Sequence, residues 1–234
     1  MLAQTKINCG NCRLGSICLP LALESHDITQ LDEIVQRGRP LQKGEYLYRK
    51  GEKFESIWAV RSGLVKAIRV TSDGLEQVTG FYFPGEIVGM DGIGSEKYAA
   101  SVVALETSAV CEIPFHRLEE LSQRVPSMQR HFFKLMSQEI NSDQQLITLL
   151  SKNTAEEKIA SLLLSISARN TRRNLSAVNV RLQMSRTDIS NFLGLTLETV
   201  SRIFSRFNKQ GLIAVDGKNV DLIDLENLRA VAKF

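Results

Sequence analysis

The sequence predicts an α+β chain: a block of short strands, then one long helix, then a small helical unit that ends in a hairpin. Between residues 40 and 115, short β-rich runs alternate with glycine-containing turns. Over residues 126–151, apolar residues recur at the heptad spacing of a long helix. Near the C-terminus, a glycine separates two short amphipathic segments. The strand spacing favours a barrel or jelly roll over a βαβ sheet.

Composition excludes several classes of protein. The 234 residues are 43% hydrophobic and 24% charged, which is ordinary for a globular chain. No apolar run approaches the ~18 residues of a membrane-spanning helix, so we expect no membrane partner. The N-terminal stretch MLAQTKINCG lacks the basic and apolar regions of a secretory signal. We therefore expect a cytoplasmic location.

The first element is a cysteine-rich loop. Cys9, Cys12 and Cys18 form a C-x2-C-x5-C pattern, and Cys111 lies in a β-rich run. A reducing cytoplasm disfavours structural disulfides, so this cluster indicates metal or redox chemistry. Four thiolates fit Zn²⁺ or an iron–sulfur cluster, although zinc sites usually use two closely spaced cysteine pairs and only one is present. Thiol–disulfide sensing stays open as an alternative.

A short helix and the strand block follow the loop. The segment HDITQLDEIVQRG, residues 26–38, has apolar residues at helical spacing. No histidine lies between residues 40 and 115, which argues against a cupin-like metalloenzyme. The glycines at 85, 89, 92 and 94 match neither a dinucleotide-binding nor a Walker pattern. We find no paired acid–base set for a redox enzyme, which leaves a ferredoxin-like carrier as the redox alternative.

The long helix over residues 126–151 begins at Pro126, which suits a first helical turn. Its heptad seam consists of Phe133, Met136, Ile140, Asp143, Ile147 and Leu150. This pattern predicts a dimerisation helix. Asp143 would meet its own copy across a two-fold axis, where desolvation and like-charge repulsion both oppose association. We therefore expect a marginal dimer that another event must stabilise.

The C-terminal unit carries a helix-turn-helix pattern in SRTDISNFLGLTLETVSRIFSRFNKQGLI. Ser185 and Asp188 predict a capping box, and Gly194 permits the turn. Thr196 predicts the cap of a second helix, which Gly211 ends. The following segment LIAVDGKNVDLID predicts a hairpin, so the unit is a winged helix. We expect the polar segment at residues 167–179 to be a loop.

The outer face of the second helix predicts DNA binding. Its members are Glu198, Ser201, Arg202, Ser205, Arg206 and Lys209. The N-terminal end of such a helix contacts base edges in the major groove, where Arg pairs with guanine and Glu with cytosine. Arg206 and Lys209 are better placed for phosphates. From Asn153 onward, 12 Lys and Arg stand against 8 Asp and Glu, an excess that fits nucleic acid.

Three segments together resemble a known family: the cysteine pattern at 9–18, ALETSAVCEIP at 104–114, and LTLETVSR at 195–202. The chain is similar to the cyclic-AMP receptor protein/FNR superfamily of transcription regulators, most closely to its oxygen-sensing FNR branch. The resemblance implies a cyclic-nucleotide-binding-like β-roll, a dimerisation helix and a winged helix-turn-helix. The implied regions are an iron–sulfur ligand loop (1–20), a sensory β-roll domain (21–125), the dimerisation helix (126–152) and a winged-helix DNA-binding domain (153–234).

The resemblance also implies a mechanism. Cys9, Cys12, Cys18 and Cys111 would ligate a [4Fe–4S] cluster, and the anaerobic, cluster-bound homodimer would bind palindromic double-stranded DNA with TTGAT-type half-sites. Oxygen would degrade the cluster and release monomers. Glu198, Ser201 and Arg202 match the base-contacting residues. Leu197 replaces an Arg of cyclic-AMP receptors, which favours FNR-type sites.

Two further partners follow from the same resemblance. The hairpin at residues 71–76 corresponds to a surface loop that contacts RNA polymerase, although a plain solvated turn explains these residues equally well. The stretch at residues 98–102 lacks the arginine that holds a cyclic phosphate, so we expect no cyclic nucleotide. The expected function is an oxygen-responsive transcription regulator. The alternative is a thiol- or zinc-based redox-sensing regulator of the same fold.

Overall fold

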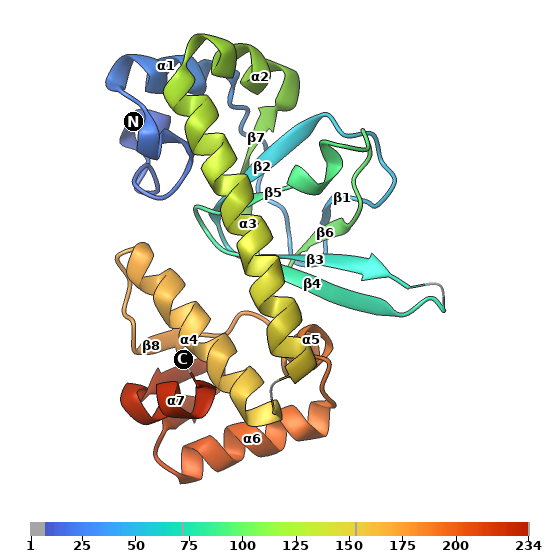
Figure 1. Cartoon of the computed structure of the whole chain (residues 1–234), viewed down its shortest axis with the longest axis vertical. Coiled ribbons are helices and arrows are strands. Elements are labelled where there is room, and N and C mark those ends of the chain that lie inside the picture. The colour runs from blue at the N-terminus through green and yellow to red at the C-terminus, as the bar shows by residue number, and fades with distance from the viewer. Residues whose placement is uncertain (1–7, 72, 153, 234) are drawn as a thin grey trace, which may run out of the picture. The chain divides into compact units, whose positions relative to one another are not determined.

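The computed structural model describes residues 8–71, 73–152 and 154–233 (Figure 1). It divides into two compact units, Met1–Arg69 with Phe81–Glu139, and Val70–Gly80 with Ile140–Phe234. Within the described part of the chain, no helix combines the length and hydropathy needed to cross a membrane.

The first unit opens with short helices and continues as antiparallel sheets. Its N-terminal helices are η1 (Cys9–Asn11), η2 (Leu19–Ala22) and α1 (Ser25–Ile34). The strands that follow along the chain are β1 (Tyr46–Tyr48), β2 (Ser56–Ser62), β3 (Val65–Val70), β4 (Glu76–Tyr82), β5 (Ile87–Val88), β6 (Ser101–Ala104) and β7 (Ala109–Pro114), with η3 (Met90–Gly92) after β5. The end of β3 and most of β4 belong to the second unit. The strands form two sheets, in the orders β1-β6-β3-β4 and β5-β2-β7. The predicted β-roll is confirmed.

Tight turns hold the roll together. Gly63, between β2 and β3, has φ 81°, and a Cβ there would lie 2.6 Å from the carbonyl oxygen of Thr107. Only glycine combines this backbone conformation with so close an approach. Inside the roll, the rings of Tyr48 and Tyr98 stack at 3.7 Å between centroids, and both residues are buried.

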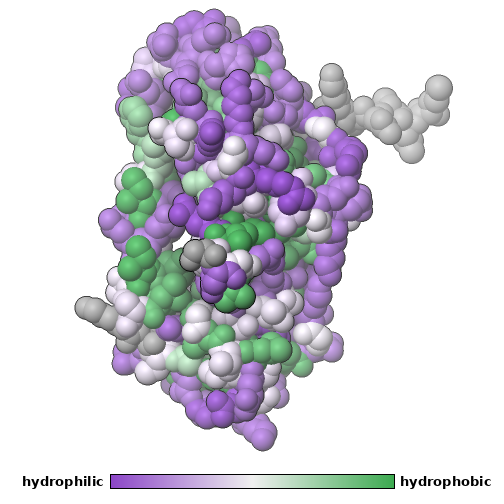
Figure 2. Space-filling model, turned by 90° about the vertical axis from the view of Figure 1, so that its right-hand side faces the viewer, coloured by the Kyte–Doolittle hydropathy of each residue, from purple (hydrophilic) through white to green (hydrophobic). Residues whose placement is uncertain are grey.

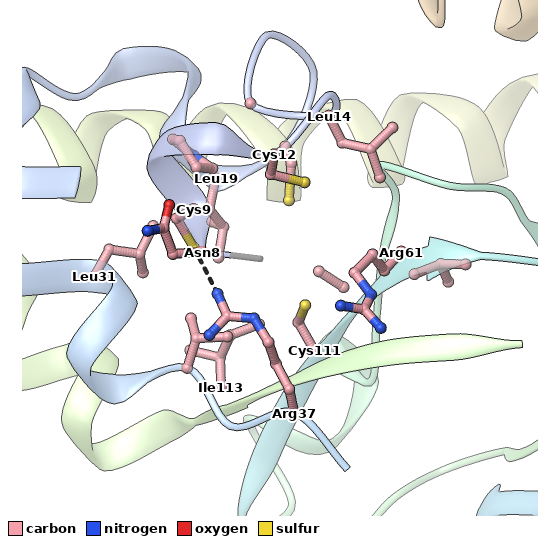
Figure 3. Close-up of a pocket in the computed structure, with 16 residues that line it drawn as sticks. Asn8, Cys9, Cys12, Leu14, Leu19, Leu31, Arg37, Arg61, Cys111 and Ile113 are labelled. Carbon is pink, nitrogen blue, oxygen red and sulfur yellow. Dashed lines mark hydrogen bonds between the residues drawn. The ribbon is translucent and has the colours of Figure 1, made fainter. Parts of the chain in front are cut away.

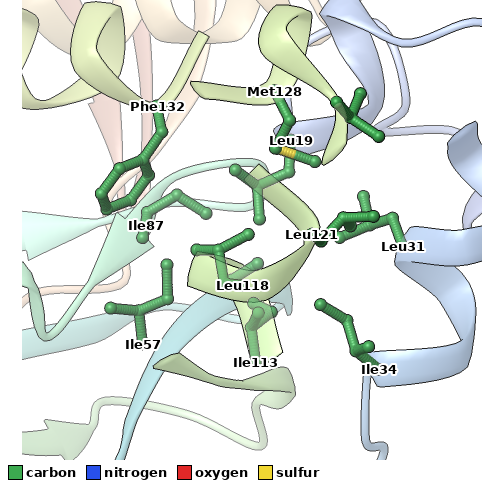
Figure 4. Packing of buried hydrophobic residues seen from close by; sticks show 12 residues of the cluster. Leu19, Leu31, Ile34, Ile57, Ile87, Ile113, Leu118, Leu121, Met128 and Phe132 are labelled. Atoms are coloured by element: carbon green, nitrogen blue, oxygen red, sulfur yellow. The ribbon is translucent and has the colours of Figure 1, made fainter. Parts of the chain in front are cut away.

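The core of the first unit joins the sheet to the helices around it. Leu19 after the cysteine loop, Leu31 of α1 and Ile113 of β7 are each almost fully buried (Figure 4). Met128 and Phe132, from the first turns of the long helix, pack into the same cluster. The cysteine loop therefore shares a core with the start of the long helix.

A helix that the sequence analysis did not identify precedes the long one. α2 (Phe115–Arg124) buries Leu118 and Leu121 and exposes most of its charged residues. Pro126 explains the break, because the residue before a proline avoids the helical conformation and Val125 has φ −122° and ψ 88°. The predicted long helix follows as α3 (Pro126–Lys152).

After the end of α3, the second unit continues with α4 (Ala155–Arg172), which starts at a Thr154–Glu157 capping box. The expectation of a loop from residue 167 is wrong, because α4 continues to Arg172. Ser167 and Asn170 are polar but buried. Their side chains donate hydrogen bonds to the backbone carbonyls of Ala177 at 2.6 Å and Ser176 at 3.0 Å. These residues tie the end of the helix to the loop after it.

The winged helix-turn-helix is confirmed. It consists of β8 (Asn179–Arg181), α5 (Arg186–Leu193), α6 (Leu197–Lys209), β9 (Ile213–Asp216), β10 (Asn219–Leu222) and α7 (Leu225–Ala232). The Ser185–Asp188 capping box and the Thr196 cap both form. Gly194 adopts the left-handed conformation, with φ 63°, that the turn requires. The three strands make a sheet in the order β8-β10-β9.

Candidate metal centre and nucleic-acid interface

Four free thiols line one pocket. Cys9, Cys12 and Cys18 come from the N-terminal loop, and Cys111 comes from β7, about a hundred residues later (Figure 3). All four are partly exposed and none forms a disulfide. The structure thus brings together the residues that the sequence analysis selected as metal ligands. Among the described residues, no three His, Cys, Asp or Glu side chains are grouped closely enough to hold one metal ion.

Local hydrogen bonds shape the cysteine loop. Asn8 and Asn11 form a capping box around η1, which presents Cys9. The backbone N–H of Gly15 donates to the Cys12 carbonyl at 3.0 Å, and that of Cys18 donates to the Leu14 carbonyl at 2.9 Å. The loop is therefore folded back on itself, with its three cysteines on the side of the pocket.

A close contact holds the loop against the roll. Gly85 has φ 95°, and a Cβ at that position would lie 2.6 Å from Cδ1 of Ile17, next to Cys18. Glycine is needed there both for the backbone conformation and for the space that Ile17 occupies.

Strand pairing positions the fourth cysteine. Cys111 lies opposite Ala59 in the β2–β7 ladder, between the buried residues Ala109 and Ile113. A second backbone pair, between Gln36 after α1 and Glu112, holds the chain that follows α1 beside the same strand. Strand pairing thus holds Cys111 on the wall of the pocket that lies across from the cysteine loop.

Two arginines flank the thiols. The Nη2 of Arg37 donates to Sγ of Cys9 at 3.4 Å and also pairs with the Asp32 carboxylate. Asp32 accepts the backbone N–H of Cys9 at 2.8 Å. Arg61 lines the pocket on the other side of Cys111 (Figure 3). No sequence motif marks these three charged residues, because they come from separate elements and meet only in the fold.

The pocket disfavours bare thiolates. Burial raises the pKa of the Cys9 and Cys18 thiols to about 12. Burial also raises the pKa of Cys111, against the opposing effect of Arg37 and Arg61. Such thiols are protonated at neutral pH and are poor nucleophiles. A metal that binds here has to displace their protons.

The outer face of α6 is fully available to a ligand. All six predicted DNA-contact residues on this helix are exposed, whereas Val200, Ile203, Phe204 and Phe207 are buried beneath it. Glu198 and Arg202 face each other at 4.0 Å across one helical turn. Arg206 forms an ion pair with Glu156 of α4.

One residue missed by the sequence analysis supports this helix. The guanidinium of Arg186 lies 3.2 Å from the ring centroid of Phe204 and packs α5 onto α6. Burial lowers its pKa to about 10.

The seam of α3 is unusually apolar for a surface. Phe133, Ile140 and Ile147 are 59%, 56% and 65% exposed. Met136 and Leu150 are half-buried, and Asp143 is exposed among them. A line of exposed apolar side chains along one helix is typical of an association surface.

Apolar residues reach the surface elsewhere as well. Figure 2 shows them in separate groups among polar side chains. In the hairpin between β3 and β4, Val70 is 47% and Leu75 is 65% exposed. The backbone N–H of Thr71 donates to the Leu75 carbonyl at 2.9 Å and closes this hairpin.

A β-roll, a long helix with an exposed seam and a winged helix-turn-helix define a class of DNA-binding transcription regulators. Residues 38–125 match the family described as cyclic nucleotide-binding domain, and residues 157–231 match the Crp-like helix-turn-helix domain.

Relatives of known name agree with this class. The chain is 51% identical over 230 residues to the transcriptional activator protein Anr of Pseudomonas aeruginosa, covering 98% of this chain and 94% of that protein. It is 44% identical over 228 residues to the fumarate and nitrate reduction regulatory protein of Escherichia coli, covering 97% and 90%. The solved structure of FixK2 from Bradyrhizobium japonicum matches with a TM-score of 0.78 at 27% identity, covering 85% and 97%. The chain belongs to the cyclic-AMP receptor protein/FNR superfamily, a family of transcription regulators and not of enzymes.

Proposed function

We propose that this protein is an oxygen-responsive transcription activator of the cytoplasm. Its proposed ligand set for a [4Fe–4S] cluster is Cys9, Cys12, Cys18 and Cys111. The observation that carries the proposal is the convergence of these four thiols, from two distant segments, on one pocket. A cubane takes one thiolate at each of four separate irons, so its ligands need not converge on one point. When bound, the cluster supplies an oxygen-labile link between the cysteine loop and β7.

Buried contacts connect this pocket to the dimerisation helix. His131 of α3 is buried and hydrogen-bonds the backbone of Cys18. Leu19, the next residue, packs in the same core as Met128 and Phe132 of α3. A change in the position of the loop therefore also displaces side chains in the first turns of α3, because the close-packed core leaves no space for independent movement.

The proposed output is homodimerisation and sequence-specific binding to double-stranded DNA. The α3 seam pairs with its copy across a two-fold axis, which matches the symmetry of a palindromic site. Glu198, Ser201 and Arg202 contact bases. Arg206 and Lys209 contact phosphates, and Ser205 lies between the two sets. The hairpin at residues 71–76, with Leu75 exposed, is proposed to contact RNA polymerase.

Neither alternative sensor fits the pocket as well. A thiol sensor needs reactive thiolates, whereas burial holds the pKa of Cys9 and Cys18 at about 12. A single zinc ion needs ligands gathered around one point. Cyclic-nucleotide sensing is also disfavoured, because residues 98–102 include no arginine and Tyr98 is stacked on Tyr48 in the buried core of the roll.

The test is an absorbance spectrum of protein purified without oxygen, with assays of iron and acid-labile sulfide, followed by a pulse of air. About four iron and four sulfide per chain, as a cubane requires, and bleaching in air are expected. Cys111→Ala should lose the iron while the winged helix still folds. A colourless protein with zinc or no metal, or a Cys111→Ala variant with full iron, would contradict the proposal.

A further inference from the structure

The Cys9 end of the pocket contains an ion pair that the proposed ligand set does not use. Arg37 and Asp32 have side chains only 20% and 28% exposed. The same Nη2 of Arg37 bonds both the Asp32 carboxylate and Sγ of Cys9. Figure 3 shows the second of these contacts, at 3.4 Å. The Nε of Arg37 is buried and has no hydrogen-bond partner among the described residues.

The backbone holds Arg37 in this place. Helix α1 ends at Ile34, and Gln36 then pairs with Glu112 through reciprocal backbone hydrogen bonds of 2.8 and 2.9 Å. Arg37 follows directly, so it projects next to the strand position of Cys111. Asp32, on the last turn of α1, fixes both the Arg37 guanidinium and the Cys9 backbone. One carboxylate thus couples the orientation of the cation to that of the loop.

A structural salt bridge alone does not account for this arrangement. An ion pair that only stabilised α1 would need neither a contact with sulfur nor a buried donor without a partner. Leaving a buried donor without a hydrogen bond lowers the stability of the fold. Four thiolates around a [4Fe–4S] core form a net anion. A fixed guanidinium with an unused N–H matches such a partner, because hydrogen bonds between ionised groups are short and strong.

We propose that Arg37, held by Asp32, is a positioning residue that orients the Cys9 thiolate and compensates the negative charge of the cluster. Arg37 donates to Cys9, and its Nε–H would be available to donate to a sulfur of the bound cluster. Hydrogen bonds to the sulfurs and local charge set the reduction potential of such centres. Outer partners of metal ligands commonly change metal affinity about 10–100-fold. This inference rests on the proposed cluster function.

The experiment compares the anaerobic holoprotein with Arg37→Gln, Arg37→Lys and Asp32→Asn. It measures the reduction potential by voltammetry and the rate of iron loss to a chelator without oxygen. Arg37→Gln should lose iron about 10–100-fold faster and shift the potential to more negative values, because removing a cation disfavours the reduced, more negative state. Arg37→Lys should have a reduction potential close to that of the wild type, since lysine keeps the positive charge that Arg37→Gln removes. Arg39→Gln, an exposed neighbour whose side chain is 72% exposed, is the matched control and should leave both quantities unchanged.

The outcomes separate this inference from the function on which it rests. A wild-type protein without about four iron refutes the cluster itself. A wild-type protein with the cluster, together with an Arg37→Gln variant of unchanged potential and iron loss, refutes the role of Arg37 alone. An equal shift in Arg39→Gln also refutes it. If Arg37→Gln does not fold, Asp32→Asn decides, because it keeps an acceptor for the Cys9 N–H but frees the guanidinium. It should speed iron loss, and an unchanged rate of iron loss refutes the positioning role of the pair.

Discussion

Replacing Asp143 with alanine should turn the oxygen-exposed, metal-free protein from a monomer into a dimer. Asp143 is an exposed carboxylate on the same face of α3 as Phe133, Ile140 and Ile147. In a symmetric helix pair, each seam residue meets its own copy. The substitution removes two like charges from the interface and leaves the apolar seam intact.

The apolar gain and the cost of association nearly cancel. Full burial of one large apolar side chain contributes about 1.5–3 kcal/mol. Phe133, Ile140 and Ile147 still expose 59%, 56% and 65% of their surfaces, so burial in a dimer can supply more than half of this free energy for each side chain. Six such side chains in a dimer give about 6–10 kcal/mol, against about 4–15 kcal/mol for the loss of free motion. A small additional free-energy contribution at the seam therefore decides whether the dimer forms.

Asp143 supplies a term of that size. Packed helices lie about 8–10 Å apart, and two unit charges about 8 Å apart repel by about 0.5–2 kcal/mol at effective dielectric constants of about 80 to 20. Desolvation of both carboxylates adds to this cost. Because each 1.4 kcal/mol is about tenfold in Kd, Asp143→Ala should tighten the dimer about tenfold or more.

Sedimentation velocity under air measures this change. Asp143→Asn removes the charge but keeps a polar group, which separates repulsion from desolvation. Glu52→Ala, an exposed turn residue, controls for net charge and should stay monomeric. High salt should bring the dimer dissociation constant of the wild type closer to that of Asp143→Asn, because the screening length falls from about 10 Å at 0.1 M to about 3 Å at 1 M. Asp143→Ala with the wild-type dimer constant would refute the reasoning.

Two further predictions concern DNA binding and the cysteine loop. Arg202→Ala should cost about 1–3 kcal/mol of DNA-binding free energy and relax selectivity at one base pair. Lys209→Ala should instead weaken binding to all sequences alike and reduce the salt dependence of binding. Fluorescence anisotropy titrations on half-site variants measure both effects, and a uniform loss of affinity for Arg202→Ala counts against base contact. Gly85→Ala and Gly44→Ala should each lose about 1–2 kcal/mol in urea unfolding, because both glycines have positive φ. Gly85→Ala should lose about 1–3 kcal/mol more, because only its Cβ would meet Ile17, at 2.6 Å; equal losses would exclude this contact.

The winged helix was predictable because its signals are local. The Ser185–Asp188 capping box, the left-handed Gly194 and the Thr196 cap each depend on residues within one helical turn. The four cysteines could be selected for a similar reason, since three of them share one short pattern. Their common pocket depends on the pairing of β7 with β2 and emerges only in the fold.

Helix α2 and the end of α4 were not predictable from composition. Leu118 and Leu121 are the only buried residues of α2 and stand among charged neighbours. In α4, Ser167 and Asn170 favour a loop by their polarity, yet their side chains bond carbonyls beyond the helix end. A polar side chain is buried when a partner from another segment satisfies it, and sequence alone does not identify that partner.

The sequence by itself determined the order of elements and which face of α6 is exposed, because capping, turn chemistry and side-chain periodicity act over a few residues. Only the tertiary structure decided what surrounds the thiols. Asp32, Arg37 and Arg61 lie on different elements, and no spacing relates them to Cys111. Electrostatic effects depend on distance in space and on burial, and both are set when the loop, α1 and β7 pack against one another.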